Sequence, residues 1–283
     1  MLAVAMVALA SGRGEHSREL AAEARECASW LEGTRGVYRD EHTQQARDGG
    51  FTSQFCQDRS LFEEVFAPAL GRRRGTYVDV ASNHFKRISN TYFLDRCLGW
   101  RGVCVEPNPI YHAGLRANRS CDLIPSCVSD STAEVELVLP REEWLGGLGG
   151  VGGGRLMDYV GSRKRAALRQ SGVAASHRAR CKLLGEELVR RGLQRIDLLS
   201  LDVEGHEDHV LRGVDFKRIH IDHVLCERTG VASRRTPDQR RVGCTSILSR
   251  LGYTRVRLNG LCGGDDVLWR HPNASSPYRA LLT

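Results

Sequence analysis

The chain has 283 residues, of which 41% are hydrophobic and 27% are charged, and its formal net charge at pH 7 is +7. This composition excludes a disordered chain, and the length suits one α/β domain that carries an extension. No apolar stretch reaches the ~18 residues of a membrane-spanning helix, and the basic residues form pairs and triplets rather than a tail. We therefore expect neither a transmembrane segment nor a nucleic-acid partner.

The sequence predicts an N-terminal extension over residues 1–52 and a main domain over residues 53–283. Apolar residues recur three and four positions apart within residues 15–32, which is the spacing of an amphipathic helix. The apolar residues 1–10 follow no basic segment and are near the lower length limit of a signal peptide. The sequence therefore favours a soluble cytoplasmic protein, with the lumen of the secretory pathway as the alternative.

From residue 76 onward, short apolar runs alternate with amphipathic segments. The expected strands cover residues 77–81, 102–106, 123–128, 134–139, 196–203, 221–227, 253–258 and 266–270. The expected helices cover residues 61–66, 91–98, 109–118, 183–191, a segment that ends at 211, and 240–251.

This alternation of strands and helices predicts a mostly parallel sheet with helices on both faces. The last two strands have no helix between them, so they predict an antiparallel hairpin at one edge. A glycine- and arginine-rich insertion at about residues 141–180 separates the two halves of the pattern. We expect this insertion to lie above the carboxyl edge of the sheet, either as a lid or as a segment that binds the acceptor substrate of a reaction at that edge.

The ten cysteines are numerous for a cytoplasmic enzyme of this size, yet no two form a C-x-x-C pair. A zinc site is therefore not expected, and neither is any other metal site. Several cysteines stand within apolar runs, such as Cys104 in residues 102–105, where we expect a small buried hydrophobic side chain. One or two disulfides are the alternative if the chain is secreted.

Acidic residues stand at the ends of four expected strands, at Asp79, Glu106, Asp202 and Glu227. Ligands of open α/β sheets bind at the carboxyl ends of the strands, and four acids there would be costly without donor groups or a cation. A nucleoside offers two ribose hydroxyls as donors. The loop after the first strand, residues 81–83, has neither a glycine pair nor a phosphate-binding lysine, which favours a nucleoside without phosphates, such as S-adenosylmethionine.

Four segments together carry a resemblance to a known family: residues 77–83 (YVDVASN), 89–94 (SNTYFL), 98–109 (LGWRGVCVEPNP) and 196–207 (IDLLSLDVEGHE). They are similar to the FkbM family of S-adenosylmethionine-dependent methyltransferases, over roughly residues 53–270. The resemblance implies a class I, Rossmann-like methyltransferase fold with a seven-stranded sheet whose last strand is antiparallel. The first loop of the family usually carries glycines, whereas here it carries small residues.

The resemblance also implies which residues bind S-adenosylmethionine. The expected cofactor-binding residues are Asp79, Ala81, Ser82, Asn83, Asn90, Thr91, Glu106, Val128, Ser129 and Asp202. Glu106 is expected to accept hydrogen bonds from both ribose hydroxyls, and Asp79 to orient the first loop or hold the amino-acid part. Asn90 and Thr91 are expected to cap the first helix and reach the cofactor carboxylate. Val128 and Ser129 are expected beside the adenine.

The methyl group is expected at the end of the central strand, which makes Asp202, Glu204 and His206 the candidate catalytic residues. His206 suits the role of general base, because an imidazole titrates near neutrality. The expected acceptor is a hydroxyl on a small molecule or a carbohydrate. Two alternatives stay open: a nucleotide-sugar glycosyltransferase or other nucleotide-using enzyme, because Asp202 and Glu204 are also typical of metal-holding acids, and a non-catalytic binding module on the same fold.

Overall fold

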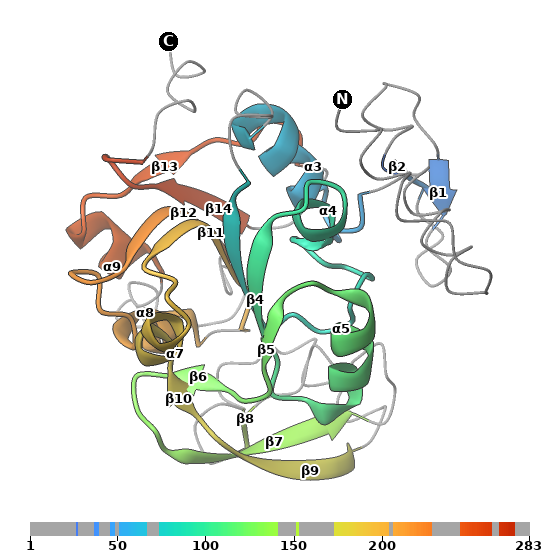
Figure 1. Ribbon diagram of the computed structural model, residues 1–283, viewed down its shortest axis with the longest axis vertical. Helices are drawn as coiled ribbons and strands as arrows, with labels where there is room; N and C mark the ends of the chain where they lie inside the picture. Colours follow the sequence, from blue (N-terminus) through green and yellow to red (C-terminus); the bar gives the residue numbers. More distant parts are fainter. Residues whose placement is uncertain are drawn as a thin grey trace, which may run out of the picture.

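A central seven-stranded sheet organises the computed structural model, which describes residues 27, 37–39, 46–48, 51–66, 74–140, 151–152, 173–203, 206–227, 244–261 and 266–274. The strand order is β13-β14-β12-β11-β3-β4-β5 (Figure 1). In that order the strands are β13 (Thr254–Val256), β14 (Asp266–Arg270), β12 (His220–Glu227), β11 (Arg195–Leu201), β3 (Thr76–Val80), β4 (Arg101–Val105) and β5 (Asp122–Ile124).

Five neighbouring strands of this sheet, from β12 to β5, run parallel. Strand β14 lies between β12 and β13 and pairs antiparallel with both. The order reverses between β3 and β11, which is where an open α/β sheet forms its ligand crevice. The predicted mostly parallel sheet is confirmed.

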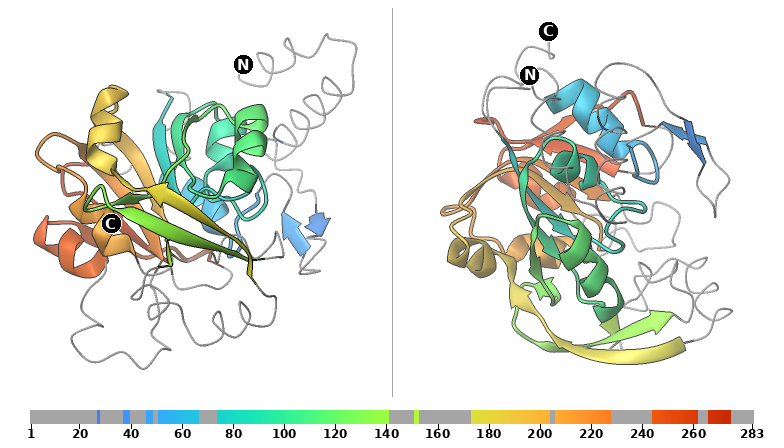
Figure 2. Two further views of the ribbon diagram at one scale, coloured as in Figure 1. Left: turned by 90° about the horizontal axis from the view of Figure 1, so that it is seen from below. Right: turned by 45° about the vertical axis from the view of Figure 1, so that its right-hand side comes forward.

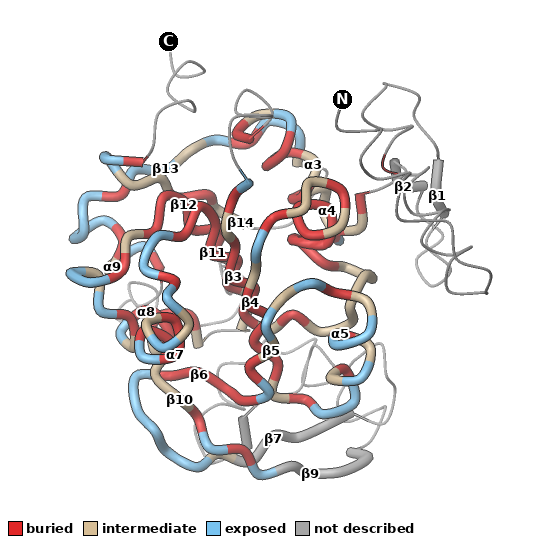
Figure 3. The backbone as a smooth tube through the Cα atoms, viewed as in Figure 1, coloured by how far each residue is buried: buried red, intermediate tan, exposed pale blue. Residues whose placement is uncertain are grey.

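Helices cover both faces of the sheet, as the sequence predicts (Figures 1 and 2). Helices α7 (Leu184–Arg190), α8 (Glu207–Arg212) and α9 (Cys244–Arg250) contribute to one buried cluster. The other face is covered by the π-helical turn η1 (Leu61–Phe66), which follows α3 (Gln57–Ser60), and by α4 (Tyr92–Arg96) and α5 (His112–Asn118). Alternate residues of one strand serve the two clusters, Val78 the first and Tyr77 the second, so the sheet is buried on both sides (Figure 3).

The predicted strand over residues 123–128 is interrupted. Pro125 has no N–H to donate to a neighbouring strand, so β5 ends at Ile124, and the short β6 (Val128–Ser129) follows outside the main sheet. Strand β6 pairs in parallel with β10 (Lys182–Leu183), just before α7. A 3-10 turn, η3 (Pro109–Tyr111), precedes α5.

The predicted strand over residues 134–139 forms, but in a separate antiparallel sheet of order β8-β7-β9. Its strands are β7 (Glu134–Pro140), β8 (Val151–Gly152) and β9 (Val173–Arg180). Strands β7 and β9 cross the molecule beyond the end of the main sheet (Figure 2). Part of the expected insertion is therefore regular structure, while residues 141–150 and 153–172 lie outside the described residues.

Near the N-terminus the structure describes one strand pair and one helical residue. Strands β1 (Val37–Arg39) and β2 (Ala46–Asp48) pair antiparallel. The predicted helix over residues 15–32 lies outside the described residues, apart from the buried, helical Cys27. None of the helices in the described part of the chain has the length and apolar character needed to cross a bilayer.

The cysteines are the largest departure from the sequence-based expectation. Four disulfides join Cys27–Cys97, Cys104–Cys121, Cys127–Cys181 and Cys226–Cys244, and Cys56 is also disulfide-bonded. No described cysteine is free. The expectation of a buried Cys104 thiol is therefore wrong: the side chain is buried, but it is bonded to Cys121, whose Cα lies 5.6 Å away.

The close approach of β3 and β4 makes Gly102 a sensitive position. A Cβ added there would lie 2.0 Å from Cζ of the Tyr77 ring, so Gly102→Ala should lower the free energy of unfolding by about 3 kcal/mol. Gly192→Ala is the matched control, because Gly192 has open space around it and a positive φ of 68°, which costs about 1 kcal/mol. Urea unfolding of both variants measures the difference, and equal losses would contradict the described contact.

Candidate functional site

The first loop folds back tightly over the end of β4. Ala81 and Asn83 have positive φ angles of 64° and 52°, a conformation that usually favours glycine. The N–H groups of Ala81 and Ser82 both donate to the carbonyl oxygen of Val105, at 2.9 and 3.2 Å. The Ser82 hydroxyl donates to the carbonyl oxygen of Asp79 at 2.8 Å. The small residues of this loop therefore take up the backbone turn at a cost that glycine would avoid.

Glu106 follows β4 directly and is buried beside this loop. Its Oε2 accepts the N–H of Asn83 and its Oε1 accepts the N–H of Asn108, each at 2.7 Å. Burial raises the pKa of Glu106 to about 7, with a smaller contribution from the charge of Asp79, against the lowering effect of the two N–H groups. A carboxylate oxygen can accept two hydrogen bonds, so both oxygens keep capacity for further donors.

The side chain of Asp79 is buried and hydrogen-bonded to hydroxyl groups of the protein. Its Oδ2 accepts the Thr91 hydroxyl at 2.6 Å, and the Ser200 side chain of β11 also bonds to it. Burial raises the pKa of Asp79, while the charge of Arg119 opposes that rise. The Asp79 side chain therefore ties the start of α4 to the strands beneath it.

Asn90 also contacts Ser200, and it has an unused acceptor. Its Nδ2 donates to the Ser200 hydroxyl at 3.3 Å, across the switch point between β3 and β11. Its Oδ1 is buried and has no hydrogen-bond partner among the described residues. A buried carbonyl oxygen without a donor costs about 1–3 kcal/mol, so this atom is suited to receive a donor from a ligand.

The cap of α4 differs from the prediction. The Ser89 hydroxyl accepts the N–H groups of Thr91 and Tyr92, at 3.2 and 3.1 Å. The hydroxyl of Thr91 instead donates to Asp79. Thr91 does occupy the N-cap position, but neither its side chain nor that of Asn90 caps the helix, and the Ser89 hydroxyl does so instead. Three consecutive residues of a cap-forming type stand here, and the sequence alone cannot rank them.

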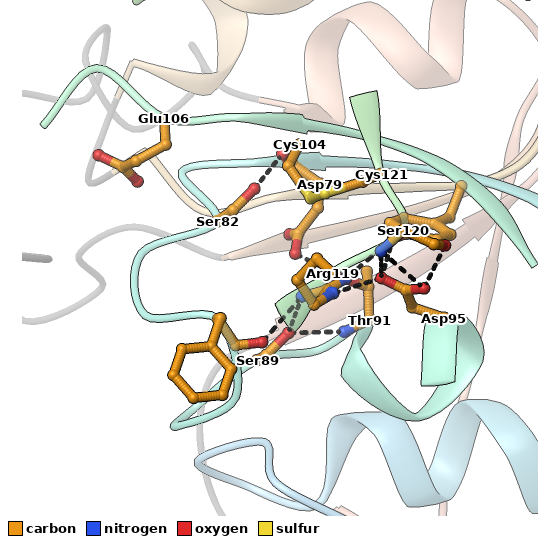
Figure 4. The surroundings of a disulfide bond; sticks show 12 residues. Asp79, Ser82, Ser89, Thr91, Asp95, Cys104, Glu106, Arg119, Ser120 and Cys121 are labelled. Atoms are coloured by element: carbon orange, nitrogen blue, oxygen red, sulfur yellow. Dashed lines mark hydrogen bonds and ion pairs between the residues drawn. A yellow bond between two sulfur atoms is a disulfide. The ribbon is translucent and has the colours of Figure 1, made fainter. Parts of the chain in front are cut away.

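A buried ion pair supports the site from behind, and the sequence analysis missed it. Nε of Arg119 lies 2.5 Å from Oδ2 of Asp95, and neither side chain has any exposed surface. Figure 4 shows Asp79 between Arg119 on one side and Ser82 with Glu106 on the other. An arginine after a helix and an aspartate within one look like surface residues in a sequence, so no local signal indicated this pair.

A second group of polar residues surrounds the predicted general base. Nε2 of His206 lies 2.9 Å from the Ser129 hydroxyl, which brings the end of β6 against the start of α8. The rings of His206 and His209 stack with centroids 4.4 Å apart, and Nδ1 of His209 lies 2.8 Å from Oδ2 of Asp130. Burial and the neighbouring His209 lower the pKa of His206 to about 4.

The remaining predicted residues are Val128, Asp202 and Glu204. Val128 is buried in β6, and Asp202 is half-buried just after β11. Glu204 lies outside the described residues. Within the described ranges, no three His, Cys, Asp or Glu side chains form a group that could hold a metal ion. The structure thus joins Asn83 to Glu106, Thr91 to Asp79 and Ser129 to His206 by direct contacts.

The pKa of His206 can be measured directly. NMR titration of the His206 ring should give an apparent pKa near 4, because desolvation disfavours the charged form, so the ring is neutral throughout the physiological range. His209→Asn removes the like charge stacked on it and should raise that pKa toward 6.5. A wild-type value of 6.5 would contradict the described burial of this ring.

Comparison with known proteins adds one finding. The family model for the methyltransferase FkbM domain matches residues 71–254, which is more than half of the chain and contains the elements from β3 to α9. No curated protein matches the chain. No solved structure matches it either. The strand order, the buried acid after β4 and the family match agree, and the chain belongs to the FkbM methyltransferase family.

Proposed function

We propose that this methyltransferase uses S-adenosylmethionine to methylate a hydroxyl group on a small molecule or a carbohydrate. One observation carries the proposal: the buried carboxyl group of Glu106 stands at the carboxyl end of β4, against the first loop, with acceptor capacity left on both oxygens. A nucleoside presents its two ribose hydroxyls as a pair of donors, which a carboxylate can receive together.

The residues around the switch point fit the rest of this cofactor. The unpartnered Oδ1 of Asn90 would accept a hydrogen bond from the cofactor ammonium group. Ala81, Ser82 and Asn83 would line the path of the nucleoside with small side chains and backbone. Val128 and Ser129, which form β6, would lie beside the adenine. When bound, the cofactor supplies a methyl group on a positively charged sulfur.

The chemical step needs alignment more than it needs strong acid–base catalysis. The acceptor oxygen forms a bond to the methyl carbon as the carbon–sulfur bond breaks, and the hydroxyl proton must leave. The reason given for His206 as base, an imidazole that titrates near neutrality, is wrong for this ring, because burial lowers its pKa to about 4. The neutral Nε2 is therefore a weak base at pH 7, and it accepts that proton directly or through the Ser129 hydroxyl. Asp202 would orient the acceptor at the end of β11.

Calorimetry and a transfer screen test this function. S-adenosylhomocysteine should bind to the protein, whereas a UDP-sugar and NAD should not. A screen of labelled-methyl transfer to extracts of the source cell should then identify a hydroxyl acceptor. In that assay His206→Asn should keep cofactor affinity and lose roughly 10²–10⁴ in turnover. Binding of a UDP-sugar or NAD in place of S-adenosylhomocysteine would overturn the proposal.

We further propose that the protein folds in an oxidising compartment, in place of the cytoplasm that the sequence favours. Nine described cysteines are disulfide-bonded, and such bonds persist in secretory lumens and outside cells. In sealed vesicles from the source cell, the protein should resist added protease until detergent is present. Digestion without detergent, together with cysteines that react freely with an alkylating agent, would contradict this assignment.

The role of Glu106 predicts a pH-dependent affinity. Only the ionised carboxylate can accept both ribose hydroxyls, and its pKa in the free protein is raised to about 7. Binding of S-adenosylhomocysteine should therefore tighten as the pH rises, by roughly tenfold between pH 6 and pH 8. Glu106→Ala should weaken binding at pH 8 by roughly 2–3 kcal/mol.

Glu106→Gln is the matched control for this experiment, because it keeps the size of the side chain but cannot ionise. Its affinity should be low and nearly independent of pH across the same range. Calorimetric titrations at three pH values measure both effects. A folded Glu106→Ala variant with the wild-type dissociation constant would remove Glu106 from the cofactor site.

A further inference from the structure

The guanidinium group of Arg119 is buried and uses every donor it has. An arginine carries five N–H groups in a fixed planar fork, and all five have acceptors here. They donate to Asp95 Oδ2 (2.5 Å), Phe85 O (3.2 Å), Ser89 Oγ (3.2 Å), Tyr77 Oη (3.0 Å) and Thr91 Oγ1 (2.7 Å). The side chain is therefore held in one orientation.

Three of these acceptors belong to the segment that connects the first loop to α4. The Phe85 carbonyl lies just beyond the loop, Ser89 is the cap of α4, and the Thr91 hydroxyl also donates to Asp79. Asn90, whose Oδ1 has no hydrogen-bond partner among the described residues, lies in the chain between two residues that Arg119 holds. Arg119 thus fixes the residues on both sides of Asn90, and the Asn90 side chain itself donates to Ser200.

A disulfide fixes the segment that carries Arg119. Cys121 stands two residues after Arg119 and bonds to Cys104, which is fully buried in β4, two residues before Glu106. Ser120 lies between Arg119 and Cys121, and its N–H and hydroxyl both donate to Asp95 (Figure 4). The strand that presents Glu106 and the arginine that holds the neighbours of Asn90 are therefore covalently joined.

We propose that Arg119 is a positioning residue of the cofactor site and that the Cys104–Cys121 disulfide holds it in place. This inference rests on the proposed function, because it assigns the network to S-adenosylmethionine binding. Arg119 does not touch the ligand; it sets the positions of residues 85–91 against β3 and β4. Loss of either the planar fork or the disulfide then weakens cofactor binding in a protein that is still folded.

Arg119→Lys tests the role of the planar guanidinium group. Lysine keeps the charge and can pair with Asp95, but its three donors cannot reach all five acceptors. The dissociation constant of S-adenosylhomocysteine should rise roughly tenfold, which is typical of coupling between linked sites. Arg195→Lys is the matched control, because Arg195 pairs with Asp222 at the amino end of the sheet, and it should leave the dissociation constant unchanged.

A pair of double variants tests the disulfide and keeps the inference falsifiable if Arg119→Lys does not fold. Cys104→Ser/Cys121→Ser and Cys226→Ser/Cys244→Ser remove bonds with sequence separations of 17 and 18, so both should lose similar stability. Calorimetry is done well below the melting temperature of each variant. Only the first double variant should bind S-adenosylhomocysteine more weakly, again by roughly tenfold.

The outcomes separate this inference from the function on which it rests. Wild-type affinity in a folded Arg119→Lys variant would overturn the inference and leave the proposed function intact. Equal weakening in both double variants would also overturn it, because it would trace the loss to general stability. A wild-type protein that binds no S-adenosylhomocysteine would overturn the proposed function and the inference together.

Discussion

The buried ion pair of Arg119 and Asp95 is the constraint on which the rest of the site depends. A buried charge is tolerated only when it is paired and its remaining polar atoms are bonded, because desolvation of each ion costs several kcal/mol. Here Arg119 has five acceptors, and Asp95 also receives donors from Tyr77 and Ser120. These requirements fix β3, α4 and the segment before β5 relative to one another.

The two buried acids in front of this pair are satisfied in different ways, which gives them different roles. Asp79 is bonded to hydroxyl groups and lies near the charge of Arg119, so its carboxyl group holds elements of the protein interior together. Glu106 is bonded to two backbone N–H groups, one on each oxygen, and each oxygen can accept one more donor. Strand-end acids that look equivalent in a sequence thus differ in their partners, and this difference is the basis for the proposal that Glu106 binds the ligand.

Much of the fold could be predicted, because a parallel strand that is buried on both faces appears in the sequence as a short run of apolar residues. The runs that became β3, β4, β11 and β12 are mostly apolar, and an acid follows β4 where the chain leaves the sheet. Pro125 also explains the end of β5 in local terms. The burial of Arg119 could not be predicted, since it depends on Asp95, 24 residues away, through packing that no periodicity records.

The disulfides and the helix cap were missed for two other physical reasons. Cysteine pairing depends on Cα distances in the folded chain, and the bonded pairs are separated by 17 to 70 residues. The cap depends on which of Ser89, Asn90 and Thr91 faces the free N–H groups of α4, and all three can form one. The choice of Ser89 is made by Arg119 and Asp79, which occupy the Thr91 hydroxyl.

A crystal structure of the protein with S-adenosylhomocysteine tests the central claim most directly. The account predicts both ribose hydroxyls within hydrogen-bond distance of the Glu106 carboxylate, the ligand ammonium group at Oδ1 of Asn90, and Arg119 unmoved behind them. A ligand bound away from the carboxyl ends of β3 and β4, or a bound ligand that leaves Glu106 with only the N–H groups of Asn83 and Asn108, would contradict it.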